Sequence, residues 1–169
     1  NAIAGLSTAD IQVLNTSQVA ALSASTFGAM SSTQIGALTT DQVVAMSAAQ
    51  AAALTAGQVA GLSTAQLAAM QTTDVRSMTG SAVAALNTAQ LDAFSTAQMQ
   101  ALSNAAVAGL STTQVASISN TDLQALSTSQ VSVMTPAQIA ALSTSQLAAM
   151  ETADFAVLKS SAIAGLSTA

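Results

Sequence analysis

The chain has 169 residues and a net charge of −5, about half of its residues are apolar, and it contains no His, Cys, Trp or Tyr. This composition removes the usual general base, the thiol nucleophile and the soft metal ligands, while its two cations, Arg76 and Lys159, are too few for a nucleic acid or an anionic membrane surface. We therefore expect no enzyme, no catalytic, metal or cofactor site and no nucleic-acid partner.

An eight-residue pattern repeats along the whole chain. Twenty complete octads run without insertion or deletion from Ser7 to Leu166, and partial octads lie on either side. Positions 1 to 8 read Ser/Thr, Thr, small, Gln, Ile/Val/Leu, Ala, Ala, Leu/Met, and residues 143–150 are a typical copy. Self-similarity at a fixed period is typical of arrays and solenoids. Residues 1–169 are thus predicted to be a single repeat array.

The first complete octad, residues 7–14, already carries two devices that begin a helix. Ser7 and Asp10 form the capping-box pattern, in which a hydroxyl and a side chain three residues later each bind the other residue's backbone N–H. The apolar residues at position 8 of one octad and position 5 of the next form a hydrophobic staple. Each octad from 7–14 to 159–166 is therefore predicted to contain a capped helix of about six residues, with positions 5 and 8 in the core.

Charged and special residues farther along the chain fit the same register. Six of the seven acids fall at the cap or in the first helical turn, where the helix dipole favours negative charge, and Asp92 is the exception. The six are Asp10, Asp41, Asp74, Asp122, Glu151 and Asp154. Pro136 lies at position 2, the first helical residue, where its missing N–H costs nothing. Four glycines at position 7 are predicted to ease the turn at the helix end: Gly5, Gly61, Gly109 and Gly165.

The fold class that follows is an all-α solenoid of very short capped helices, one per octad. A continuous helix is disfavoured, because at about 100° per residue its apolar stripe would drift by about 80° per octad. A β-solenoid remains the alternative, although Ala and Gln dominate and the apolar spacing is not two. We expect successive helices to fold back on each other, so that two octads make one 16-residue coil. Small residues at position 7 would then allow close approach, and Leu and Met at position 8 would fill a thin core.

A longer period overlies the octads. Position 4 departs from Gln or Asp at Ala2, Ala82 and Ala162, which are 80 residues apart, and at Thr26 and Ala106, which have the same separation. The pattern is compatible with two super-repeats of ten octads, residues 1–80 and 81–160, and chance matches within a biased repeat are the alternative.

Three further features have a weak functional interpretation. Position 2 is Thr in 11 of 20 octads, which would form a column of Thr in a regular solenoid, as in some ice-binding proteins. Asn15-Thr16-Ser17 is a formal glycosylation sequon that coincides with a predicted cap. Every octad carries polar residues, so we expect no membrane span.

Residues 63–70 and 135–142 resemble the STAQIAAL-type repeat tracts of very large secreted bacterial proteins described as adhesin-like or surface proteins. The resemblance covers the whole chain and implies an extracellular structural or adhesive role without catalytic residues. We therefore expect a rigid stalk, fibre or matrix element of a bacterial surface or filament that associates with itself end to end or laterally. The alternative is a binding module whose regular Ser/Thr face contacts ice, glycan or a partner protein.

Overall fold

Residues 2–160 and 162–163 are described by a computed structural model, and within them every regular element is helical. The elements are η1 (Ala2–Gly5), α1 (Thr8–Val13), α2 (Thr16–Ala20), α3 (Ala24–Gly28), α4 (Ser32–Gly36), α5 (Thr40–Val44), α6 (Ala48–Ala53), α7 (Ala56–Ala60), α8 (Thr64–Ala69), α9 (Thr72–Ser77), α10 (Gly80–Ala84), α11 (Thr88–Asp92), α12 (Thr96–Ala101), α13 (Asn104–Gly109), α14 (Thr112–Ser117), α15 (Asn120–Ala125), α16 (Thr128–Ser132), α17 (Pro136–Ala140), α18 (Thr144–Ala149) and α19 (Thr152–Val157). The all-α solenoid with one helix per octad is confirmed, and the β-solenoid alternative is wrong for these residues.

Each octad forms a helix in the predicted way, as residues 63–70 illustrate. Ser63 is extended, with φ −74° and ψ 160°, and its hydroxyl accepts the backbone N–H of Gln66 at 3.2 Å. Met70 ends the helix in an extended conformation, and its N–H donates to the Leu67 carbonyl at 3.2 Å. Pro136 occupies the first turn of α17, as predicted. The extended residues at positions 8 and 1 therefore separate one helix from the next.

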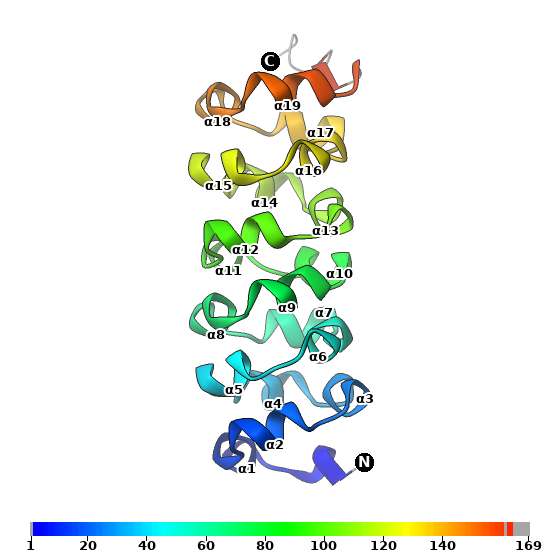
Figure 1. Cartoon of the computed structure of the whole chain (residues 1–169), viewed down its shortest axis with the longest axis vertical. Coiled ribbons are helices and arrows are strands. Elements are labelled where there is room, and N and C mark those ends of the chain that lie inside the picture. The colour runs from blue at the N-terminus through cyan, green and yellow to red at the C-terminus, as the bar shows by residue number, and fades with distance from the viewer. Residues whose placement is uncertain (1, 161, 164–169) are drawn as a thin grey trace.

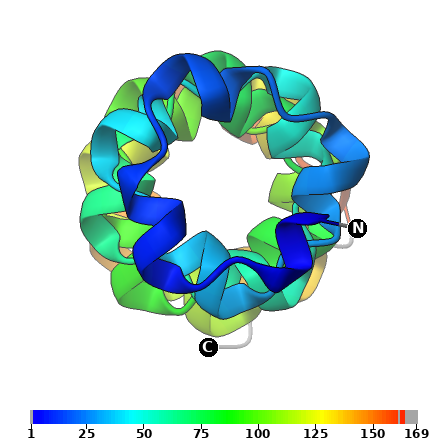
Figure 2. The same ribbon diagram turned by 90° about the horizontal axis from the view of Figure 1, so that it is seen from below.

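The helices wind into a right-handed superhelix (Figures 1 and 2). A helix packs against the third helix along the chain, as α3 does against α6, and α6 in turn against α9. One turn thus contains between three and four octads, and the expected 16-residue coil is wrong. The physical reason is the extended junction, which turns the chain through a corner, seen in Figure 2, instead of reversing it.

Helices ten octads apart return to matching places on the rod. In Figure 1, α3 and α13 both lie on the right, and α8 and α18 both lie on the left. The 80-residue spacing seen in the sequence therefore corresponds to about three turns of the superhelix. This relation is compatible with the super-repeats 1–80 and 81–160, which stay a prediction.

A continuous core runs along the axis. The side chain at position 5 is buried in every octad from Ile3 to Ile139, and that at position 8 is buried from Met30 to Leu158. The methionines at these positions fill the core as expected. From residue 7 to residue 158 the two side chains of each octad lie in one shared cluster or pack against it.

Several glycines allow close approach between turns. Gly61 lies in the right-handed region with φ −82°, and no described glycine has a positive φ, so the predicted role in easing the helix end is wrong. A Cβ added to Gly36 would lie 2.8 Å from the carbonyl oxygen of Gly61, and one added to Gly61 would lie 3.1 Å from that of Ser32. These glycines allow the backbones of α4 and α7 to meet. Gly165 lies outside the described residues.

Candidate functional site: the glutamine ladder between turns

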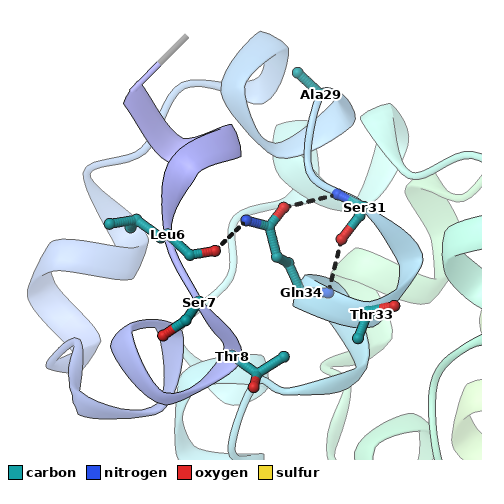
Figure 3. A pocket seen from close by; sticks show the side chains of 7 residues that line it. All are labelled: Leu6, Ser7, Thr8, Ala29, Ser31, Thr33 and Gln34. Atoms are coloured by element: carbon teal, nitrogen blue, oxygen red, sulfur yellow. Dashed lines mark hydrogen bonds between the residues drawn. The ribbon is translucent and has the colours of Figure 1, made fainter.

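The side chain of Gln34 joins two turns of the superhelix (Figure 3). Its Oε1 accepts the backbone N–H of Ser31 at 2.9 Å, which completes the capping box of α4. Its Nε2 donates to the carbonyl oxygens of Ile3 and Leu6, each at 2.8 Å, in the turn below. One side chain therefore begins its own helix and binds the end of an earlier one.

The same arrangement recurs at eleven glutamines, which we call the glutamine ladder. They are Gln34, Gln42, Gln50, Gln58, Gln66, Gln90, Gln98, Gln114, Gln130, Gln138 and Gln146. In each, Nε2 donates to the position-8 carbonyl 28 residues earlier, at distances from 2.6 Å for Gln66 to 2.8 Å for Gln146. A further bond reaches a carbonyl 30 or 31 residues earlier, such as that of Gly36 from Gln66. The ladder thus connects each turn to its predecessor.

The chemistry of the ladder requires an amide. Every ladder glutamine is at most 6% exposed, so its polar atoms depend on protein partners. The amide oxygen accepts one backbone N–H while the NH₂ group donates two hydrogen bonds, which satisfies both ends. A carboxylate of the same length could accept the N–H but would direct a negative oxygen at two carbonyl oxygens. The preference for Gln over Glu at position 4 follows from the bonds between turns.

Position 4 carries other residues in several octads, and there the ladder is interrupted. Ala82 and Ala106 are fully buried but offer no donor. Asp122 turns outward, where its carboxylate accepts the hydroxyls of Ser119 at 2.7 Å and Thr96 at 2.9 Å. The sequence marks these interruptions, but only the structure shows that they remove the amide bonds to the turn below.

The Thr column stays a prediction. The structure gives one contact of a position-2 Thr with the neighbouring turn that bears on it: Thr96, at position 2, donates its hydroxyl to Asp122, at position 4, at 2.9 Å. The first residue of the sequon, Asn15, is an exposed helix cap whose Oδ1 accepts the N–H of Gln18 at 2.8 Å.

Glu151 and Asp154 share the capping box of α19, but the described acids form no larger cluster. Within the described residues, no three potential metal-binding side chains gather in one place. The surface hollows that the structure shows are open grooves between turns, such as the one beside Leu6, Thr8 and Gln34 in Figure 3. In the same part of the chain, none of the helices has the length and apolar character needed to cross a bilayer.

A family model for the ALTTAQ repeat matches residues 19–48, 67–104 and 115–150, which together are more than half of the chain. The chain belongs to the ALTTAQ-repeat family. The six letters correspond to positions 7, 8 and 1 to 4 of the octad, so they span the junction between helices and end on the ladder glutamine, as in residues 37–42. No curated protein and no solved structure matches the chain.

Proposed function

We propose that this ALTTAQ-repeat array is a structural element outside the cell, a stiff rod that serves as a stalk, fibre or matrix element of a bacterial surface or filament. The observation that carries the proposal is the glutamine ladder, because it links turn to turn above one continuous core. Stability in such an array comes from contacts between neighbours and extends over any number of repeats.

The location outside the cell is supported by two properties of the sequence. It resembles tracts of large secreted surface proteins, and that resemblance extends over the whole chain. Arg76 and Lys159 are also the only residues at which a trypsin-like protease could cleave. A rod with so few cleavage sites is suited to an environment that contains proteases.

Self-association belongs to the proposal because the surface has little charge with which to repel a second copy. Only nine side chains of the sequence are charged, and the described part exposes Val13 and Val44 on α1 and α5. Copies could meet side by side or end to end, the latter by continuing the ladder from one molecule to the next.

Negative-stain electron microscopy over a concentration series tests this function. We expect uniform narrow rods at low concentration that lengthen or form bundles as concentration rises. Gln66→Met should shorten or bend the rods, while Gln18→Met is the matched control, because Gln18 is exposed and its side chain bonds locally, to the cap residue Asn15 of α2. Rounded particles without a constant width would contradict a structural rod. Rods that never associate, together with thermal hysteresis or glycan binding, would favour the binding module.

A further inference from the structure

Asp74 occupies a ladder position without the chemistry of a ladder residue. Its side chain is 1% exposed, and its Oδ2 is the one buried side-chain nitrogen or oxygen of the described residues that has no hydrogen-bond partner. The other oxygen, Oδ1, accepts a long bond of 3.5 Å from the Thr73 hydroxyl. An unpaired buried carboxylate oxygen costs free energy, which a proton on the carboxyl group would reduce.

The register of the ladder indicates what lies opposite Asp74. The ladder glutamines bind carbonyl groups 28 and 30 or 31 residues earlier, and the residues 28 and 31 before Asp74 are Met46 and Val43. In this octad the cap residue Gln71 bonds to the turn below, since its Nε2 donates to the Val44 carbonyl at 2.7 Å. By the register of the ladder the Asp74 carboxyl group faces hydrogen-bond acceptors, and only its protonated form can donate to them.

We propose that Asp74 is an acid-responsive contact of the rod, neutral when α9 is seated on the turn below and ionised when that contact opens. The contact tightens as the solution becomes more acidic. This property concerns how one joint of the solenoid is regulated, and it does not depend on where the protein functions.

The direction in which stability changes with pH follows from the surroundings of the Asp74 carboxyl group. Burial raises the pKa of Asp74 above its usual value, against smaller opposing contributions from the backbone N–H of Gln71 and the hydroxyl of Thr73. In the unfolded chain the group ionises near its ordinary pKa of about 3.9. Between these two values the folded state binds more protons, so the free energy of unfolding falls as pH rises through the window and stays lower above it.

Charged groups nearby are few. Helix α9 packs against α6 and α12, and neither these nor the flanking α8 and α10 contain a titratable side chain. The charged residues of the surrounding elements are Arg76 on α9 itself and Asp41 on α5, and both are exposed. The titration assigned to Asp74 is thus separate from that of a charged partner.

Thermal unfolding between about pH 4, near the ordinary pKa of the group, and about pH 8 tests the proposal on the full chain. We expect the unfolding midpoint of the unmodified protein to drop by a few degrees across this range, and Asp74→Asn to lose most of that drop because its amide stays neutral. Asp122→Asn is the matched control, since Asp122 has the same octad position but a partly exposed carboxylate bonded to hydroxyls. Equal pH dependence of the unmodified protein and Asp74→Asn would overturn the proposal.

Carbon-13 NMR of the aspartate carboxyl groups gives an answer that needs no variant to fold. The Asp74 signal of the folded protein should titrate with a pKa above the ordinary aspartate value of about 3.9. A pKa at or below that value would show that the folded rod holds Asp74 ionised, and the proposed acid-responsive contact would be wrong.

Discussion

Two stretches of the rod hold their turns together in different ways. Residues 31–70 form five consecutive octads whose position-4 glutamines all bond to the turn below. Residues 71–126 contain seven octads, of which only three have a ladder glutamine. The superhelix nevertheless continues through the second stretch without a change of direction (Figure 1).

Close backbone packing continues where glutamine is missing. A Cβ added to Gly80 would lie 2.9 Å from the carbonyl oxygen of Ala105, so α10 and α13 meet almost directly. Ala82 and Ala106, in the same two helices, have no exposed surface. Turns are thus joined in two ways, by a long amide that bridges them and by small residues that let them touch, and in α10 and α13 the second way acts without the first.

The largest expected effect comes from breaking a helix in a ladder-complete stretch. Ala140→Pro removes a backbone donor inside α17 and places a ring against the preceding turn, so we expect a loss of about 3 kcal/mol in the free energy of unfolding. Pro136→Ala is the control, because that proline occupies the first turn, where no donor is used. Chemical denaturation measures both, and equal losses would contradict the capping register.

Removing one ladder amide should have the next largest effect. Gln66→Met keeps the volume but leaves the carbonyl groups of Gly36 and Leu38 without their side-chain donor, at a cost of about 2 kcal/mol. Gln18→Met removes only the local bond from the Asn15 backbone N–H to the Gln18 side chain and should cost less. If both variants unfold at the same denaturant concentration, the bonds between turns contribute little.

Adding a methyl group at a close backbone contact tests how much the direct packing of turns contributes to stability. Gly36→Ala would place its Cβ 2.8 Å from the Gly61 carbonyl oxygen, and we expect a loss of about 1 kcal/mol after the gain in helix propensity is included. Gly57→Ala is the control, because nothing lies within 4 Å of its added Cβ, and it should be neutral or stabilising. A stabilised Gly36→Ala would show that α4 and α7 can separate without cost.

The smallest expected effect on stability comes from Asp10, an exposed acid outside the ladder. The hydroxyl and backbone N–H of Ser7 lower the pKa of Asp10, so its contribution to stability is present above the ordinary aspartate range and is lost as pH falls through the folded value. The difference in unfolding midpoint between the unmodified protein and Asp10→Asn should therefore shrink only in strong acid. A difference that stays constant with pH would argue against this cap interaction.

Local features of the fold could be predicted from the sequence because they act over three or four residues. The cap at Ser63, the proline of α17 and the buried positions 5 and 8 are all as expected. The number of octads per turn could not be predicted, since it depends on the angle that the extended junction makes, and that angle leaves no periodic signal.

The sequence predicts one of the two roles of the ladder glutamines, the capping box, but not their bonds between turns. The capping box explains why a polar residue stands at position 4, but it does not explain why that residue is Gln rather than Glu, which the helix dipole would favour. That preference was the signal for a second, distant partner. The partners themselves, backbone carbonyls 28 residues earlier, have no side-chain identity that a sequence could reveal.

The direction of the ladder has a mechanical consequence. Its bonds connect one turn to the next along the length of the rod (Figure 1). Tension on the two ends therefore loads the turns in series, and the turns would open one at a time. Each turn that gives way would release 28 residues, which extend to about 100 Å of chain. A rod of this kind would lengthen in steps under a sudden tensile force, and could recover its length as the turns closed again.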